Sequence, residues 1–124
     1  MMNQTSKLIR TAAILTTSYV AATTIEDAQN YNQLHLRLLY TQNTLTSLEI
    51  KIEYSIDGTN YVRQTNASIS TGTTTLSVNE YTFTGSGNLE IVVPISARFV
   101  KVSAKGTGTV TATSLAIWAT LSVV

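Results

Sequence analysis

The sequence contains no cysteine, one proline and one histidine among its 124 residues. Without cysteine there are no disulfides and no thiolate metal sites, so the chain must be held together by its hydrophobic core or by neighbours in an assembly. A metal site built from a cluster of histidine and cysteine ligands is excluded by the same counts.

Charge is also scarce. Charged residues make up 12% of the chain, and the formal net charge is +1. Such a chain produces no large electrostatic field, so we expect neither a nucleic-acid partner nor an anionic membrane partner. No stretch approaches the roughly 20 apolar residues that a membrane-spanning helix needs. Residues 7–22 have the outline of a signal peptide, but threonines and a serine interrupt the apolar part, and we expect no cleaved leader.

Hydroxyl side chains are what the sequence has in abundance. Threonine and serine together account for 34 of the 124 residues, and 22 of these are threonines. The β-branched threonine side chain suits the pleated, half-buried surface of a β-sheet. With so few charges, the solubility of the chain rests on these hydroxyls, or partners cover much of its surface.

The strongest local pattern lies between positions 48 and 56. Leucine, isoleucine and tyrosine alternate there with glutamate, lysine and serine without a break. This period of two predicts a β-strand with one buried face and one solvated face. The following Asp-Gly-Thr-Asn at 57–60 is typical of a tight turn, because glycine adopts positive φ readily and the aspartate and asparagine side chains can bond nearby backbone.

Similar patterns recur at intervals of about 8–12 residues, which is typical of an all-β sandwich or barrel. We predict one domain over 1–124, an antiparallel β-sandwich of eight or nine strands, with residues 1–6 as a candidate extended arm. A change of parity at 79–80 indicates a bulge or corner, and Pro94 indicates an edge strand or a strand end. The other expected strands and weaker strand segments cover 6–15, 19–25, 32–40, 63–73, 89–95, 99–105 and 109–123.

The short connection at 41–46 suggests that the strands over 32–40 and 48–56 are antiparallel neighbours. This pairing would place His35 and Arg37 near the charged row of Glu49, Lys51 and Glu53. Opposite charges that face each other across two strands contribute about 0.2–1 kcal/mol each, which helps to set the register but specifies no activity.

Catalytic and metal-binding patterns are nearly missing. The lone His35 has no motif that supplies a nucleophile or an orienting partner, so we interpret it as a surface or interface residue. Glu49 and Glu53 lie about 13 Å apart on one strand with Lys51 between them, which favours a salt-bridged row over a catalytic pair. An oxygen-ligand calcium site is an open alternative, because Asp57, Asn60, Asn88 and Glu90 lie in or beside expected turns. The segment 57–60 lacks the acidic ladder of a calcium loop, which favours a plain hairpin turn. We therefore predict no enzyme, no cofactor and no metal site.

Four apolar residues fall at positions where the alternation points them outward: Leu39, Val92, Phe99 and Trp118. Exposed apolar side chains that cluster form interfaces, and these four are our candidate interface residues. Trp118 lies among small residues, so either a partner covers it or it belongs to a binding face. A bulge that turns Trp118 inward is the alternative, because strand parity slips easily.

Two short segments resemble the galactose-binding-like, discoidin-type jelly roll. They are Tyr-Ser-Ile-Asp-Gly at 54–58, which matches the hairpin of that family, and Ala-Arg-Phe-Val at 97–100, which matches a later strand. The resemblance covers about residues 47–105 and implies a jelly-roll fold. The chain has no cysteine pair and no ligand loops rich in aromatic residues and arginine, both of which are usual in the secreted members.

The chain as a whole is similar to the small β-sandwich structural proteins of tailed bacteriophages. Tyr-Asn-Gln-Leu at 31–34, the hairpin Ser-Ile-Asp-Gly-Thr at 55–59 and Gly-Thr-Gly-Thr-Val at 106–110 support this resemblance. It implies a non-enzymatic virion protein, such as a capsid decoration or accessory protein that binds the major capsid protein or another virion protein. A homo-oligomer, with a trimer as one form, is implied by analogy. The alternatives are a neck or tail accessory protein of the virion and a carbohydrate-binding or host-adhesion module.

Overall fold

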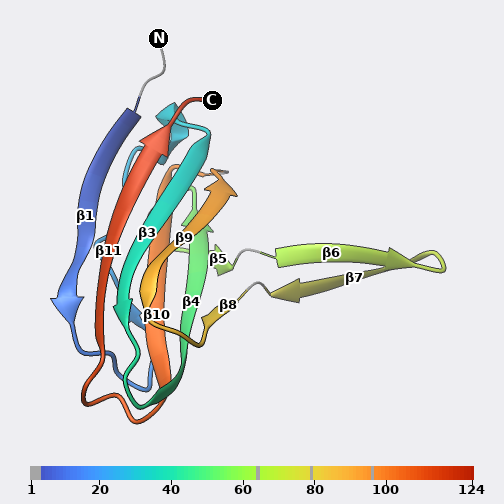
Figure 1. Ribbon diagram of the computed structural model, residues 1–124. Coiled ribbons are helices and arrows are strands. Elements are labelled where there is room, and N and C mark those ends of the chain that lie inside the picture. Colours follow the sequence, from blue (N-terminus) through green and yellow to red (C-terminus); the bar gives the residue numbers. More distant parts are fainter. Residues whose placement is uncertain (1–3, 64, 79, 96) are drawn as a thin grey trace.

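The computed structural model describes residues 4–63, 65–78, 80–95 and 97–124. Two antiparallel sheets are stacked around a common core (Figure 1), which confirms the expected all-β sandwich. One turn of 3-10 helix (η1, Ala28–Asn30) joins the two sheets. The strands are β1 (Gln4–Ala13), β2 (Val20–Ala21), β3 (Gln33–Thr41), β4 (Leu45–Ser55), β5 (Val62–Arg63), β6 (Thr65–Ser70), β7 (Thr73–Val78), β8 (Tyr81–Phe83), β9 (Gly87–Pro94), β10 (Phe99–Gly108) and β11 (Ser114–Ser122).

The chain passes back and forth between the two sheets. The four-stranded sheet has the order β1-β11-β3-β9, and the five-stranded sheet has the order β2-β10-β4-β5, with β8 also pairing with β4. Strands β1, β3, β9 and β11 thus lie in one sheet, and β2, β4, β8 and β10 lie in the other. This interleaving of strands is that of a jelly roll.

The prediction that β3 and β4 are neighbours is wrong. Strand β3 pairs with β11 and β9, whereas β4 pairs with β10, β5 and β8. The tight connection between β3 and β4, which has Asn43 at φ 54° and a bond from Leu45 N–H to the Gln42 carbonyl, crosses from one sheet to the other. The alternating pattern requires only that the apolar face of each strand is buried. Two strands that face each other across the core meet this requirement just as two neighbours in one sheet do.

The core lies between the sheets and contains the alternate residues of each central strand. Strand β3 shows this clearly, because its buried and more exposed positions alternate from Gln33 to Thr41. Eleven large side chains are almost completely inaccessible to solvent: Leu15, Leu34, Leu36, Leu38, Leu48, Ile50, Ile52, Val100, Val102, Leu115 and Ile117.

Several element boundaries differ from the expected ones. Residues 4–6 belong to β1 and pair with β11, so the expected arm over 1–6 is contradicted there, and residues 1–3 lie outside the described part of the chain. The expected strand over 19–25 shrinks to β2 and one isolated bridge between Ile25 and Val100. The last strand starts at Ser114, because residues 110–113 form a turn closed by the Thr113 N–H and the Val110 carbonyl.

The described residues form more strands than the eight or nine expected, because the region 62–83 divides into β5, β6, β7 and β8. Strands β6 and β7 form a hairpin that projects from the body of the sandwich (Figure 1). The expected corner at 79–80 falls partly on Asn79, which lies outside the described part of the chain. Pro94 ends β9, which is an edge strand as expected.

Candidate interaction surface

The solvent side of the four-stranded sheet, here called the outer face, carries three of the four candidate interface residues. Trp118 lies in the middle of this face, with Leu8 of β1 on one side and Arg37 of β3 on the other. Leu39 pairs with Ala116 in the next row, and Val92 pairs with His35 in the row on the opposite side of Trp118. The sheet therefore brings Trp118, Leu39 and Val92 together from three strands.

The side chain of Trp118 points outward. Its exposed fraction is 40%, whereas its neighbours Ile117 and Ala119 are buried with 0% and 3% exposed. The ladder between β11 and β3 runs without a register shift from Ser114 to Ser122, and the irregularities in this region lie in the β1 ladder instead. The alternative in which a bulge turns Trp118 inward is therefore contradicted.

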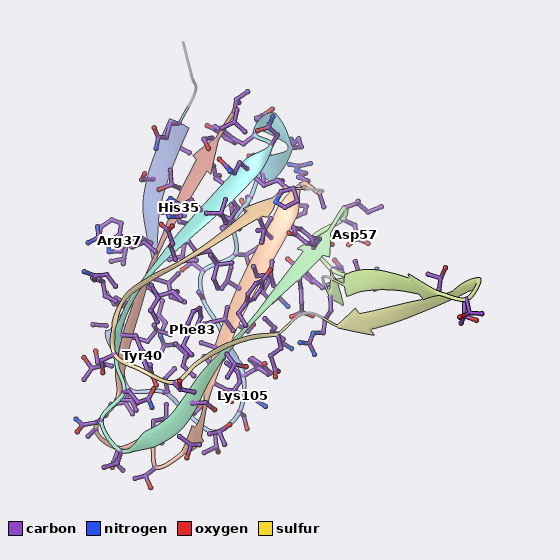
Figure 2. All side chains as sticks on the ribbon, turned by 45° about the vertical axis from the view of Figure 1, so that its right-hand side comes forward. His35, Arg37, Tyr40, Asp57, Phe83 and Lys105 are labelled. Carbon is purple, nitrogen blue, oxygen red and sulfur yellow. The ribbon has the colours of Figure 1, made fainter. Side chains whose placement is uncertain are left out.

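Polar side chains lie among Trp118, Leu39 and Val92 on the outer face, and two of them pair with each other. His35 Nε2 and Glu90 Oε2 are 2.8 Å apart, and both side chains are accessible to solvent. In the strand ladders, Arg37 lies opposite Glu90 of β9 on one side and opposite Trp118 of β11 on the other. Figure 2 shows His35 and Arg37 on the side of the molecule away from Asp57. A surface pair such as His35–Glu90 contributes about 1 kcal/mol or less, so it shapes the face rather than stabilising the fold.

Phe99 does not join the other three residues. It begins β10 in the five-stranded sheet, where it is half-buried, and its ring lies over the turn that follows β4. A Cβ added to Gly58 would stand 3.2 Å from Phe99 Cζ, and the Arg98 guanidinium lies 5.1 Å from the ring centre. Alternation correctly placed Phe99 off the core face, but alternation could not tell which of the two sheets it belongs to.

The opposite side of the molecule is covered by the chain's own tyrosines. The Tyr19 ring lies 4.6 Å from Lys51 Nζ and 4.8 Å from Lys105 Nζ, and the Tyr61 ring lies 4.0 Å from Lys101 Nζ. Lys51 also forms the expected salt bridge along its own strand, at 3.5 Å from Glu53. Tyrosine rings therefore lie against the lysines on this side, whereas the Trp118 ring on the outer face is exposed.

Strand β4 also carries Glu49, which the sequence pattern placed in a solvated row. Its exposed fraction is only 7%, and its Oε1 accepts hydrogen bonds from Ser47 Oγ at 2.5 Å and Thr107 Oγ1 at 2.9 Å. Its Oε2 is buried and accepts no hydrogen bond from the residues that the structure describes. Tyr19 donates a hydrogen bond to Glu80 beside it. Burial, with Glu80 as the second cause, raises the pKa of the Tyr19 phenol well above its ordinary value. No sequence pattern indicated that the loop after β1 reaches this surface.

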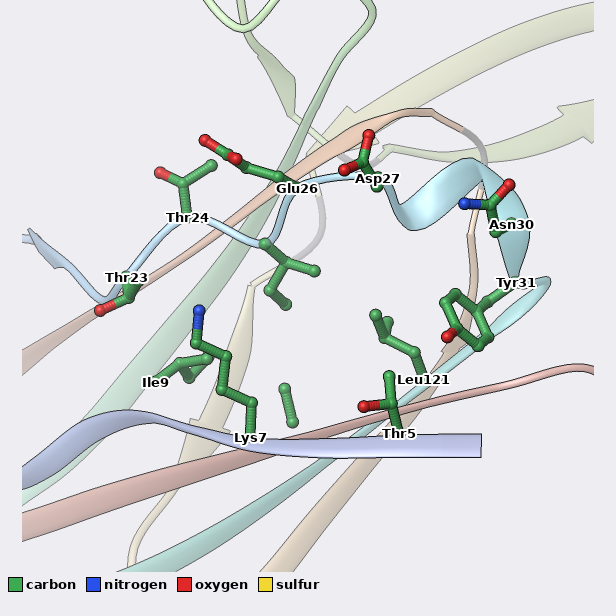
Figure 3. Close-up of a pocket in the computed structure, with 12 residues that line it drawn as sticks. Thr5, Lys7, Ile9, Thr23, Thr24, Glu26, Asp27, Asn30, Tyr31 and Leu121 are labelled. Carbon is green, nitrogen blue, oxygen red and sulfur yellow. The ribbon is translucent and has the colours of Figure 1, made fainter. Parts of the chain in front are cut away.

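A pocket of about 460 Å³ opens between β1 and the segment around η1. Lys7 extends from β1 towards Thr24 and Glu26, and the Tyr31 ring lies at the other end of the pocket (Figure 3). Asp27 on its rim has φ 55° and lies 3.3 Å from Arg98 Nε. Sequence reasoning missed this pocket because its two walls are distant in sequence. The remaining lining residues are Thr5, Ile9, Thr23, Ile25, Asn30, Ala119 and Leu121.

No protein-family model matches the chain, and a search of curated proteins finds no significant match. The part of the chain that the structure describes holds no helix with the length and apolarity of a membrane span. The same residues include no group of three or more histidine, cysteine, aspartate or glutamate side chains placed to hold a metal ion.

Proposed function

We propose that the protein is a non-enzymatic structural component of a bacteriophage virion, of the capsid decoration or accessory type, and that it docks through its outer face. The observation that carries this proposal is Trp118, which stands open in the middle of a regular sheet with Arg37 beside it. Tryptophan and arginine are two of the residue types that contribute most to binding energy at protein interfaces. The resemblance of the motifs at 31–34, 55–59 and 106–110 to phage structural proteins supports the virion as the place where this docking occurs.

The chemistry of the outer face supports docking. Leu39, Val92 and Trp118 are exposed to 36%, 50% and 40%, and they lie in three successive rows of the sheet. Arg37 lies between Trp118 and Glu90, and His35 lies opposite Val92, so polar and apolar side chains alternate on this face. Protein interfaces combine apolar side chains that lose their water with polar side chains, and arginine is enriched among the latter.

The location is tested by fractionating purified virions and quantifying this chain in each fraction. We expect many copies on the shell, bound to the major capsid protein or to another shell protein. A single ring at the neck or tail would favour a tail accessory protein instead. Virions from which the chain is missing would overturn the proposal.

The docking face is tested with two matched variants, Val92→Lys and Val62→Lys. Both residues are exposed valines on β-strands, at 50% and 67%, but Val92 lies on the outer face and Val62 lies on the five-stranded sheet. A lysine on a docked face must lose much of its water, so we expect Val92→Lys to weaken binding to shells that lack the protein at least tenfold. Val62→Lys should bind like the wild type. Equal binding of the two variants would contradict this use of the face.

The pocket between β1 and η1 favours a second candidate function, a carbohydrate-binding or host-adhesion module. Its rim offers the carboxylates of Glu26 and Asp27, the amide of Asn30 and the Lys7 ammonium, and Tyr31 supplies a ring. Such groups can bond the hydroxyls of a sugar while a ring packs on its apolar side. This candidate predicts glycan-array binding that is lost in Asn30→Ala and retained in Val92→Lys. Docking through the outer face instead predicts shell binding that is retained in Asn30→Ala and weakened in Val92→Lys.

A further inference from the structure

The four-stranded sheet ends in two edge strands, β1 and β9, and the edge of β1 is open over residues 4–8. This stretch contains no proline, whereas β9 ends at Pro94, which has no N–H. Residues 4–7 are exposed, and the bond from Thr23 N–H to the Ile9 carbonyl lies beyond them. Figure 1 shows β1 at one margin of the molecule, on the side opposite the β6–β7 hairpin. Within the described part of the chain, β1 pairs with β11 alone.

The hydrogen bonds of β3 show which way each residue of the sheet directs its backbone. Successive residues of an antiparallel strand direct their N–H and C=O groups to opposite neighbours. Ile95 N–H donates to the Asn32 carbonyl in the register that joins β3 and β9. The even-numbered residues of β3 therefore bond towards β9, and its odd-numbered residues bond towards β11.

The same alternation, carried across β11, leaves three residues of β1 unpaired. The odd-numbered residues of β3 lie opposite even-numbered residues of β11, so the odd-numbered residues of β11 bond towards β1. Their partners in the regular part of β1 are Thr5 and Lys7. Gln4, Ser6 and Leu8 therefore direct their N–H and C=O groups to the open edge. A row of unpaired backbone groups is a template for another strand.

We propose that the edge of β1 pairs with β1 of a second copy, antiparallel and about a two-fold axis at Ser6. In this register Gln4 of each copy lies opposite Leu8 of the other. All three unpaired N–H groups of each copy then meet a carbonyl of the other copy. A register shifted by two residues one way leaves Leu8 without a partner among residues 4–8. A shift the other way sets the two Lys7 side chains face to face, which is unfavourable.

The pocket between β1 and η1 gives this pairing charge complementarity. Thr5 and Lys7 both line it, and Thr5 lies at the end where the Tyr31 ring stands (Figure 3). The proposed register sets Lys7 of the partner copy opposite Thr5, so its ammonium enters the pocket at that end. Glu26 and Asp27 line the opposite wall. Two lysines, one from each copy, then face two carboxylates.

The contacts of the other lysines support this placement. The chain has four lysines. Lys51, Lys101 and Lys105 each lie between 4.0 and 4.8 Å from the centre of a tyrosine ring. Lys7 forms neither such a contact nor a salt bridge with the residues that the structure describes. The second copy brings a lysine to the Tyr31 end of the pocket, which gives that ring the same kind of neighbour.

The pairing also extends the outer face. Leu8 lies opposite Trp118, and Ser6 Oγ lies 2.9 Å from Thr120 Oγ1. Two copies form one sheet of eight strands, in which the order β9-β3-β11-β1 is followed by the same strands in reverse. The two outer faces become one surface with a Trp118 on each side of the axis. This dimer goes beyond the proposed function, because it forms without a shell.

Single cysteines test the register, because the chain has no cysteine of its own. Ser6→Cys places two cysteines on the axis, where paired Cα atoms are about 5.5 Å apart and within reach of a disulfide. Gln4→Cys sets its two cysteines about 13 Å apart along the strands. We expect mild oxidation to give a covalent dimer for Ser6→Cys and a monomer for Gln4→Cys. Equal cross-linking of the two variants would overturn the proposal.

A mixture of two cysteine variants tests the antiparallel direction. Gln4→Cys and Leu8→Cys should each stay monomeric alone, because neither position lies opposite itself. The mixture should form a disulfide between the two different chains, which mass spectrometry identifies. A mixture that yields no such disulfide would contradict the register.

Proline tests the backbone bonds. Pairing over five residues buries less surface than a standard interface, so we expect a dimer that dissociates on dilution. Ser6→Pro removes the N–H at the axis and leaves the bonds to β11 intact, so sedimentation should show dimerisation at least about tenfold weaker. Ser6→Ala and Val92→Pro, which removes an N–H at the open edge of β9, should dimerise like the wild type. Circular dichroism checks that each variant is folded. Equal weakening in Ser6→Ala, or a wild type that stays monomeric up to its solubility limit, would contradict the pairing.

The outcomes separate this proposal from the proposed function. If virions contain the chain while Ser6→Cys gives no covalent dimer, the pairing through β1 fails and the proposed function stands. If Ser6→Cys gives the dimer while virions lack the chain, the pairing stands and the proposed function fails.

Discussion

Asp57 shows how much of one turn depends on a single side chain. Its carboxylate accepts hydrogen bonds from the backbone N–H groups of Asn60 and Thr59, both at 2.8 Å, from Asn60 Nδ2 at 2.9 Å and from Ser55 Oγ at 2.8 Å. These bonds, with the Asn60 backbone first, hold the pKa of the carboxyl well below its ordinary range. The Asp-Gly-Thr-Asn turn expected from sequence is confirmed, and its bonding leaves the carboxylate engaged as a structural group.

Gly58 in the same turn has two reasons to be glycine. Its φ is +78°, and a Cβ there would stand 3.2 Å from Phe99 Cζ. We expect Gly58→Ala to lower the free energy of unfolding by about 1–2 kcal/mol, because an L-residue resists the left-handed conformation. Urea denaturation measures this effect. Gly85→Ala is the control, since Gly85 has open space around it and no positive φ; its stability should be unchanged or slightly higher, and an equal loss at both sites would contradict the explanation.

At the scale of elements, loops are held to the sandwich by side chains that replace backbone pairing. Thr113, in the turn before β11, is buried with 3% exposed. Its Oγ1 accepts the Leu15 N–H at 3.0 Å and donates to the Val110 carbonyl at 2.6 Å. This one hydroxyl joins the loop after β1 to the loop after β10, which are 98 positions apart in sequence. Leu15 is thereby fixed in the core.

Thr113→Val keeps the shape of the side chain and removes the hydroxyl. The Leu15 N–H then stays buried without an acceptor, so we expect the free energy of unfolding to fall by about 1–3 kcal/mol. Chemical denaturation gives the value. Thr111→Val in the same turn is the control, because Thr111 is exposed, and its effect should stay within about 0.5 kcal/mol. Similar losses for both variants would show that the Leu15 bond contributes little.

At the scale of the whole molecule, neighbouring residues of one strand serve different layers. Leu38 of β3 is 0% exposed in the core, and Leu39 is 36% exposed on the outer face. We expect Leu38→Ala to cost about 2–5 kcal/mol of stability, because it opens a cavity. Leu39→Ala should cost about 0.5 kcal/mol or less and should instead weaken shell binding.

Both leucine variants are best measured by urea denaturation in a Ser6→Pro background, where association does not add to the apparent stability. Binding to shells that lack the protein is then compared for Leu39→Ala alone and the wild type. A Leu39→Ala variant that loses as much stability as Leu38→Ala would contradict the division into a core layer and a docking layer.

Strand pairing shows how far sequence reasoning reaches. The alternation over 32–40 identified a strand and its buried face correctly, and so did the alternation from Leu48 to Tyr54. The last expected core residue, Ile56, is 84% exposed beyond the end of β4, and Glu49 of the expected solvated face is buried. The same patterns led to the wrong neighbour, because alternation states which residues avoid water but not which strand lies beside them. The same limit applies to the candidate interface residues, because alternation does not tell which sheet a strand joins. Three of the four residues share the outer face, and Phe99 lies on the other sheet.

By itself, the sequence determined that this protein is built of strands, which side of each central strand is buried, and where the chain turns. These are local properties, since they depend on side chains one or two positions apart. Only the tertiary structure decided that β3 and β4 lie in different sheets, that the Tyr19 ring lies against Lys51 and Lys105, and that Trp118, Leu39 and Val92 share one face. Contacts between distant segments decide these features, because the free energy of burying apolar surface depends on the area removed from water and not on which segment covers it.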